Sequence, residues 1–144
     1  METTIVREVS VNYRAAVQMS ETLSHPGQVA EAFRSILPDN SREHFMALYL
    51  SGAHRIIAYS IVSTGTALAA PAHPREVYQR AVLVGSASII IGHNHPSGAV
   101  DPSREDKQVT SGLKAAGELL GIKLLDHLII TDFEHYSFHG NGQL

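Results

Sequence analysis

A short, uninterrupted apolar segment, Ala87–Gly92, constrains the fold of this chain more than any other feature of its sequence. It contains three consecutive isoleucines, whereas a strand with one solvent-exposed face would alternate apolar and polar residues. Such a run predicts a strand that is covered on both faces. A doubly covered strand needs a packing layer on each side, so we expect a sheet enclosed between helices.

Periodic patterns elsewhere supply the other elements. Apolar residues at helical spacing, bounded by proline or glycine, predict three helices over Pro26–Leu37, Pro74–Val84 and Ser103–Leu120. We place Val77, Tyr78, Ala81 and Val82 on the apolar face of the second helix, and Val109, Leu113, Ala116, Leu119 and Leu120 on that of the third. Strand-like runs occur over Glu43–Leu50, Ile56–Val62, Ile122–Ile130 and Tyr136–Phe138. Near the N-terminus, Thr4–Asn12 is predicted as a strand and Ala15–Leu23 as a helix. The order of elements predicts an α/β or α+β fold.

The length of the chain fits one domain. A chain of 144 residues is long enough to bury a sizeable core. It contains no internal repeat, no low-complexity tract and no linker-like change of composition. We therefore predict a single domain over residues 1–144, in which residues 1–25 form a poorly defined N-terminal extension.

The composition argues against several classes of protein. The net charge is −3, and the sequence has no long cluster of Lys or Arg. The overall charge therefore does not indicate binding to nucleic acid. Without cysteine, a bound metal would be held by nitrogen and oxygen, which suits a reducing cytoplasm. The N-terminus lacks a basic and apolar signal region, and the apolar runs are too short to span a bilayer. We expect a cytoplasmic protein without a membrane partner.

The apolar run ends in His93-Asn94-His95, which predicts a metal site. Imidazoles at i and i+2 of an extended segment point to the same side and can bind one ion. Nine histidines in the chain make a chance pair easy, so a polar strand end explains the pair equally simply. A turn rich in proline and glycine follows, and a helix beginning near Ser103 could carry the Asp106 carboxylate to the ion. Three protein ligands leave one coordination position open, as in catalytic zinc sites.

Ser103 and Asp106 also have a plain structural explanation. A serine at the N-cap with an acidic residue three positions later is the capping-box pattern of a helix start. A cap, however, requires no histidines upstream. The combination of four residues at one strand–loop–helix junction favours a metal site over a cap alone. These residues are His93, His95, Ser103 and Asp106.

At this point the motif resembles a known family. His93-x-His95, seven residues, Ser103, two residues and Asp106 is similar to the motif of the JAMM (MPN+) zinc metalloproteases. The surrounding sequence resembles the RadC-like, UPF0758-type branch of this family. Four segments carry this resemblance: His-Pro-Arg-Glu-Val at 73–77, His-Asn-His-Pro-Ser-Gly at 93–98, Pro-Ser-Arg-Glu-Asp at 102–106 and Leu-Asp-His-Leu-Ile at 125–129. The similarity extends from about residue 40 to residue 138. It implies a JAB/MPN, cytidine-deaminase-like sandwich with a mixed sheet, in a short form that lacks the N-terminal helix-hairpin-helix region.

The resemblance also implies the chemistry of the site. One Zn²⁺ per chain would be held by His93, His95 and Asp106, and a glutamate upstream on a strand would act as the general base. Glu43 occupies the matching position, while Ser103 would stabilise the oxyanion. Zinc lowers the pKa of its water from about 15.7 toward about 7. The implied reaction is hydrolysis of an amide or isopeptide bond in a peptide or protein substrate.

The assignment of Glu43 depends on the family. From the residues alone, Glu43 would be a solvated charge at the end of a strand. Glu31 lies in the middle of a predicted helix, and Glu21 lies in an uncertain helical stretch, so both fit a metal-adjacent base less well. Asp126 and His127 are candidates to hydrogen-bond a ligating imidazole, although a hydrogen-bonded core pair explains them equally well.

Two other functions are compatible with the sequence. A RadC-like protein could act on or near DNA in repair, as a nuclease or an accessory protein. The His-Asn-His nuclease motif, however, spreads its residues over a ββα unit, and the acidic balance gives no phosphate-binding stripe. The second of these functions is that of a non-catalytic MPN binding module, although no residue of the metal motif is lost here. The sequence leaves the oligomeric state open.

Overall fold

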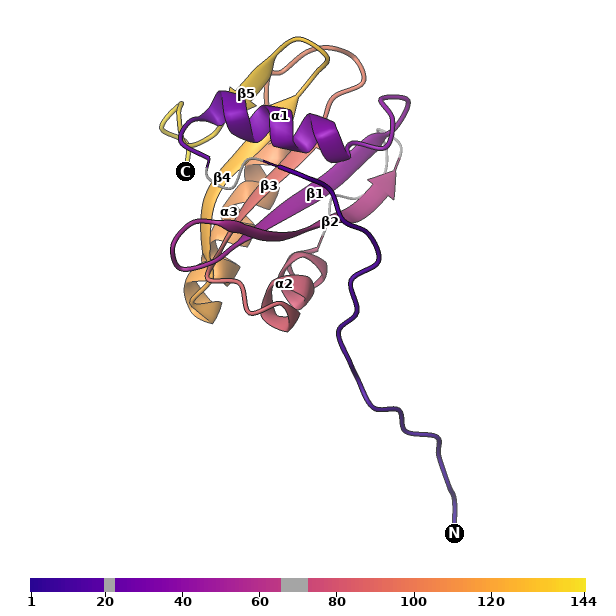
Figure 1. Cartoon of the computed structure of the whole chain (residues 1–144). Coiled ribbons are helices and arrows are strands. Elements are labelled where there is room, and N and C mark those ends of the chain that lie inside the picture. The colour runs from indigo at the N-terminus through magenta and orange to yellow at the C-terminus, as the bar shows by residue number, and fades with distance from the viewer. Residues whose placement is uncertain (20–22, 66–72) are drawn as a thin grey trace.

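The computed structural model describes residues 1–19, 23–65 and 73–144, and its elements form one layered α/β unit. In chain order these elements are α1 (Pro26–Ile36), β1 (Glu43–Leu50), β2 (Ile56–Gly65), α2 (Pro74–Leu83), β3 (Ser88–Asn94), α3 (Arg104–Leu120), β4 (Lys123–Ile130) and β5 (His135–Ser137). The five strands form a single sheet in the order β2-β1-β3-β4-β5 (Figure 1). None of the helices in the described part of the chain is long and apolar enough to cross a membrane.

The sheet is mixed. β1 runs antiparallel to both β2 and β3, whereas β3 and β4 are parallel and are connected through α3. Phe45 of β1 lies opposite His93 of β3, so the beginning of β1 and the end of β3 lie at the same edge of the sheet. α3 begins at this edge, because the helix between two parallel strands must run from the end of β3 back to the beginning of β4.

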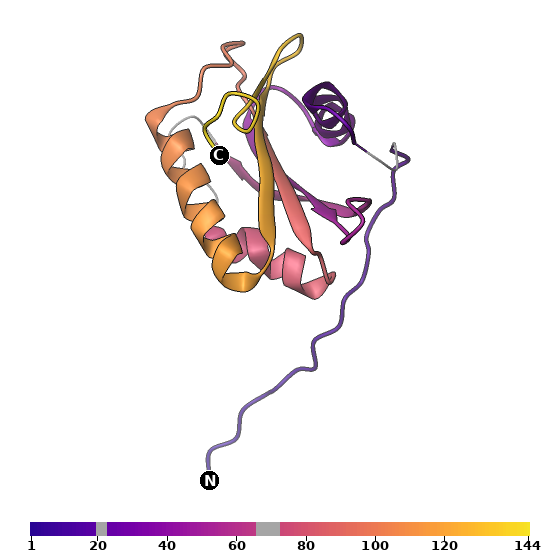
Figure 2. The same cartoon turned by 90° about the vertical axis from the view of Figure 1, so that its left-hand side faces the viewer.

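Side-chain alternation along β1 divides the core between the two faces of the sheet. Phe45, Ala47 and Tyr49 pack in one cluster with residues of α2 and α3. Met46, Leu48 and Leu50 pack in a second cluster with α1. Figure 2 shows the sheet between α1 on one side and α2 and α3 on the other. Every residue of β3 is buried. The predicted sandwich, a mixed sheet flanked by helices, is therefore confirmed, and it is consistent with a JAB/MPN fold.

The predicted N-terminal strand is wrong. Residues 1–19 form no helix or strand, and they lead away from the sheet (Figure 1). Ile5 and Val9 of the predicted strand Thr4–Asn12 are 77% and 78% exposed, because no sheet edge pairs with this segment. The predicted helix Ala15–Leu23 is absent over residues 15–19, and residues 20–22 lie outside the described part of the chain.

Three helix residues face solvent instead of the core. Leu119 and Leu120 are 88% and 51% exposed, and Val82 is 59% exposed. The buried face of α3 is set by Thr110, Leu113 and Gly117. Leu119 follows Gly117 by two positions, or about 200° around the helix, and so points away from the sheet. The strands β2 and β3 are also longer than predicted, because β2 pairs with β1 as far as Gly65 and β3 pairs with β4 as far as Asn94.

Gly117 allows α3 to approach its neighbours closely. A Cβ atom at this position would lie 2.3 Å from the Ile122 carbonyl oxygen and 2.4 Å from the Tyr78 hydroxyl. Helix propensity favours alanine over glycine by about 1 kcal/mol. The clash with a backbone oxygen outweighs that gain, since overpacking costs about 1–3 kcal/mol.

We therefore expect Gly117→Ala to lower the free energy of unfolding, measured by urea denaturation. Gly112 on the same helix is the matched control, because a Cβ there would meet nothing within 4 Å. Gly112→Ala should raise the stability by about 0.5–1 kcal/mol. Equal gains from both substitutions would show that α3 is not held this tightly.

Candidate metal centre

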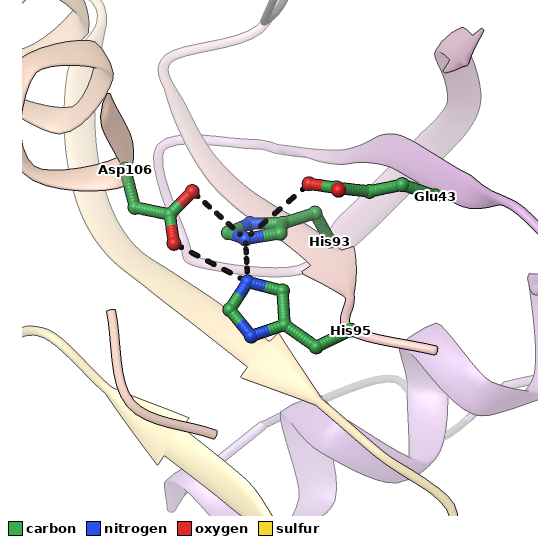
Figure 3. A group of neighbouring side chains, drawn as sticks. All are labelled: Glu43, His93, His95 and Asp106. Atoms are coloured by element: carbon green, nitrogen blue, oxygen red, sulfur yellow. Dashed lines mark hydrogen bonds and ion pairs between the residues drawn. The ribbon is translucent and has the colours of Figure 1, made fainter. Parts of the chain in front are cut away.

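Four side chains from three elements converge at the edge of the sheet where β3 ends. Glu43 is the first residue of β1, His93 lies in β3, His95 follows β3 directly, and Asp106 lies in the first turn of α3. Each offers one ligand atom, and these atoms all lie within 4.8 Å of one another. Figure 3 shows the four side chains pointing toward a common centre. The structure thus brings together four of the five predicted site residues in one cluster.

The spacing of three of these residues fits a small cation. The Nε2 atoms of His93 and His95 lie 3.0 Å apart. Asp106 places Oδ1 3.2 Å from His93 Nε2 and Oδ2 3.2 Å from His95 Nε2. Donor atoms about 2.0–2.1 Å from a tetrahedral zinc would lie about 3.3–3.4 Å from one another. Two imidazole nitrogens and a carboxylate, without sulfur, form a donor set that zinc accepts, so these residues fit the ion.

Glu43 stands slightly apart from the other three. Its Oε1 lies 3.8 Å from His93 Nε2, beyond hydrogen-bonding distance. Its side chain is 35% exposed, whereas that of His93 is 1% exposed. The side chains of His95 and Asp106 are 16% and 13% exposed, so Glu43 is the member of the cluster that is most open to solvent. Of the other glutamates considered, Glu31 lies on α1 and pairs with Arg34, and Glu21 lies outside the described residues.

The electrostatics of Asp106 and His95 reflect their mutual contact. Burial alone would raise the pKa of the Asp106 carboxyl, but hydrogen bonds from His93 and His95 outweigh burial and hold this pKa well below its usual value. The hydrogen bond to Asp106 raises the pKa of His95, against the opposing effect of burial. Asp106 is therefore an anion at neutral pH, as a metal ligand must be.

The His95 ring is oriented by a backbone carbonyl. His95 Nδ1 lies 2.7 Å from the carbonyl oxygen of Ala99. A carbonyl can only accept a hydrogen bond, so Nδ1 carries a proton. A metal binds the neutral ring. With Nδ1 protonated, that form has its lone pair on Nε2, which is the atom that faces Asp106. The turn after β3 thus prepares His95 to bind a metal through Nε2.

Ser103 caps α3 and holds the backbone around Asp106. The Asp106 N–H donates to Ser103 Oγ at 3.0 Å, and the Ser103 N–H donates to Asp106 Oδ2 at 2.8 Å. Both hydrogen bonds of the predicted capping box are present. The cap and the metal-site interpretations are compatible, because Asp106 Oδ2 also faces His95. Whether Ser103 acts in catalysis stays a prediction.

Asn94, the central residue of the His-Asn-His segment, has a role that sequence reasoning missed. It is fully buried and points to the opposite face of the sheet from its neighbours. Its Oδ1 accepts from the His44 N–H at 2.7 Å, and its Nδ2 donates to the Arg42 carbonyl at 2.9 Å. These two backbone groups flank Glu43, so Asn94 fixes the start of β1. A polar residue inside a buried strand was the available signal, since a buried amide needs partners.

His127 contacts the site, whereas Asp126 does not. His127 Nε2 lies 2.7 Å from His93 Nδ1, and its Nδ1 lies 2.6 Å from Thr110 Oγ1. Asp126 instead accepts hydrogen bonds from Ser137, from the His127 N–H and from the His139 N–H. Of the two candidates, only His127 hydrogen-bonds one of the imidazoles of the cluster. Thr110 was not foreseen, because its partners depend on how α3 lies against β4.

The fold and the cluster define a JAB-type domain with a group of residues able to hold a metal. Residues 23–143 match the family described as RadC-like JAB domain, and the chain belongs to this family. A "UPF0758 protein" of Chlorobaculum parvum is 39% identical over 144 residues, which is 100% of this chain and 65% of the relative. Proteins with the same description from Trichlorobacter lovleyi and Geotalea uraniireducens are 46% and 44% identical over 124 residues, which is 86% of this chain and 54% of each relative.

The chain thus spans between about half and two thirds of the length of these relatives. Their descriptions state no activity, substrate or partner. The family relationship and the metal-ligand geometry are therefore the two findings from which a function can be proposed.

Proposed function

We propose that this chain is a zinc-dependent hydrolase that cleaves an amide or isopeptide bond in a peptide or protein substrate. The observation that carries the proposal is the division of the cluster into two parts. Three residues have donor atoms spaced as ligands of one ion, and a fourth residue, Glu43, lies next to them without hydrogen-bonding His93. A catalytic metal site needs both parts, namely a ligand set with an open position and a nearby base.

His93, His95 and Asp106 would hold one zinc ion. When bound, zinc supplies a water molecule whose pKa lies near 7 and polarises the carbonyl that is to be attacked. The chain contributes to this chemistry by holding both Nε2 atoms and the Asp106 carboxylate close together.

Glu43 would move the proton. Its carboxylate is partly exposed, and at 3.8 Å from His93 Nε2 its oxygen lone pairs are not engaged by that ring. It can therefore accept a proton from the attacking water and later return it to the leaving amine. The hydrogen bonds of Asn94 on either side of Glu43 fix the backbone that carries this carboxylate beside the other three residues.

Ser103 would stabilise the developing oxyanion. Its oxygen already accepts the hydrogen bond from the Asp106 N–H, and this contact does not use the hydroxyl proton. The proton can therefore be donated to negative charge that appears only in the transition state, where such a bond accelerates the reaction. The cap holds the hydroxyl at the N-terminus of α3, which itself favours negative charge.

The proposal is tested by metal analysis of the purified protein together with a cleavage screen. We expect one zinc per chain, hydrolysis of some peptide or isopeptide substrates, and loss of that hydrolysis when a chelator removes the metal. Zinc added back should restore it. Single-stranded and double-stranded DNA belong in the same screen, because metal-dependent DNA cleavage without peptide hydrolysis would replace the proposal by a nuclease.

If the purified protein bound no zinc at micromolar concentration, the result would argue for a binding module without catalysis. Binding of zinc without any hydrolysis would leave only the metal site standing. The screen therefore separates the metal assignment from the assignment of the reaction.

A further inference from the structure

A buried chain of polar groups connects His93 to the backbone of Asp106 by way of His127 and Thr110. His127 is fully buried, and Thr110 is 3% exposed. We propose that Thr110 and His127 are positioning residues that keep a proton on His93 Nδ1 and so leave the Nε2 lone pair of His93 for a metal. This inference rests on the proposed zinc site, although the position of the protons can be observed without zinc.

Thr110 determines which atom donates and which accepts in each of these hydrogen bonds. Its hydroxyl oxygen lies 2.7 Å from the Asp106 carbonyl oxygen and 2.6 Å from His127 Nδ1. The carbonyl can only accept, so the single hydroxyl proton lies between the two oxygens. If Thr110 instead donated to His127, two oxygen atoms would stand 2.7 Å apart with no proton between them. Thr110 therefore accepts from His127, and His127 carries its proton on Nδ1.

The same logic then fixes His93. His127 is fully buried, and its ring nitrogens contact Thr110 Oγ1 and His93 Nδ1 rather than a carboxylate. Burial without an opposite charge favours the neutral ring, which has only one N–H. With that proton on Nδ1, His127 Nε2 is an acceptor. Its neighbour at 2.7 Å is His93 Nδ1, which must therefore donate. In the neutral form that binds a metal, His93 then has its lone pair on Nε2, the atom that faces Asp106 and His95.

Aromatic packing prevents the two rings from turning to another arrangement. His127 stacks on Phe138 with centroids 4.7 Å apart and an interplanar angle of 7°. Phe45 lies against both histidines, parallel to His93 at 5.9 Å and edge-on to His127 at 5.8 Å. A flipped ring of His127 would exchange a nitrogen for a carbon at both hydrogen bonds. The rings are thus held in the orientation that the hydrogen bonds require.

The two candidate histidine ligands are therefore oriented in different ways. His95 donates directly to a carbonyl, that of Ala99. His93 donates to a second histidine, whose own proton position depends on Thr110 and finally on the carbonyl of Asp106. Asp106 consequently acts twice, once through its carboxylate at the cluster and once through its carbonyl at the far end of the chain.

Nitrogen NMR of the histidine rings tests the proton positions directly. In metal-free protein labelled with ¹⁵N, we expect His127 to show a protonated Nδ1 and a bare Nε2, and His93 to show a protonated Nδ1. A free imidazole prefers its proton on Nε2, so this pattern would not arise without the surroundings. A proton on Nε2 of His127 would overturn the inference.

A matched pair of substitutions at Thr110 tests the effect on the metal. Thr110→Val keeps the shape and removes the hydroxyl, whereas Thr110→Ser keeps the hydroxyl and removes a methyl group. Zinc affinity is measured by competition with a chelator, after the wild-type affinity has been established. We expect the valine variant to bind roughly 10- to 100-fold more weakly, as for other residues that orient a ligand, and the serine variant to bind like wild type.

His127→Phe provides a second variant, because it preserves the stacking on Phe138 but removes the acceptor for His93. It should weaken zinc binding to the same extent as Thr110→Val. Equal affinity of the valine and serine variants would overturn the role of the chain of hydrogen bonds. Wild-type protein that binds no zinc would instead overturn the proposed function, and with it the role assigned to Thr110 and His127, whatever the NMR result.

Discussion

Replacing Asp106 by alanine should abolish stoichiometric zinc binding. Asp106 contributes the negative charge among the three closely spaced donors, and it faces both histidines at 3.2 Å. Removal of a residue that merely orients a ligand costs about 10- to 100-fold in affinity, so the loss of a ligand should exceed about 100-fold. The measurement is zinc content after dialysis, followed by chelator competition on the folded variant.

The control must account for the place of Asp106 at a helix N-terminus. Glu105→Ala removes an acid from the same turn of α3, where it has the same favourable relation to the helix dipole. This variant should keep its zinc. Asp106→Ala also loses one bond of the capping box, for which a loss of about 0.5–2 kcal/mol in unfolding free energy is expected. A folded Asp106→Ala variant that retained one zinc per chain would rule out the ligand assignment.

Replacing Glu43 by glutamine should leave the zinc in place and remove turnover. The substitution keeps the size of the side chain but removes the group that accepts the proton. General acid–base catalysis typically contributes about 10²- to 10⁴-fold, so kcat should fall by that factor while KM changes little. The comparison uses the peptide or isopeptide substrate that wild type cleaves fastest, with zinc content measured on the same samples.

Glu105→Gln is the matched control, since it makes the same chemical change at an exposed glutamate of the first turn of α3. It should retain both zinc and activity. If Glu43→Gln lost its zinc, Glu43 would have to be counted among the ligands. If it kept full activity, another group would have to be the base.

Much of the fold follows from the sequence because the patterns are strong where the chain is buried. β1 begins and ends where its apolar run predicts, and α1, α2 and α3 begin and end within a residue of their predicted limits. The errors occur where burial depends on a partner. The N-terminal segment has apolar residues but no neighbouring strand. Leu119 points away from the sheet, and Leu120 is the last residue of α3.

The ligand set could be anticipated because it lies in a compact motif, with His93, His95 and Asp106 within fourteen residues of sequence. Glu43 required the family resemblance, because only the pairing of β1 with β3 brings it to the cluster. The supporting residues are harder still. Four of the hydrogen bonds through which Asn94, Thr110 and His127 act join residues that are 17 to 52 positions apart in sequence. Such pairs depend on sheet register and helix placement, which periodicity does not specify.

The position of the cluster has a consequence for the resistance of the domain to unfolding. Its members come from the start of β1, the end of β3 and the first turn of α3, and an ion bound among them would crosslink these three elements. A ligand that binds only the folded chain adds about 2.7 kcal/mol of stability at a concentration 100 times its dissociation constant. Purified samples that differ in metal content would then differ in melting temperature. A substitution that removes one of these residues would therefore lower the melting temperature of the metal-bound protein, an effect that can be measured without a substrate.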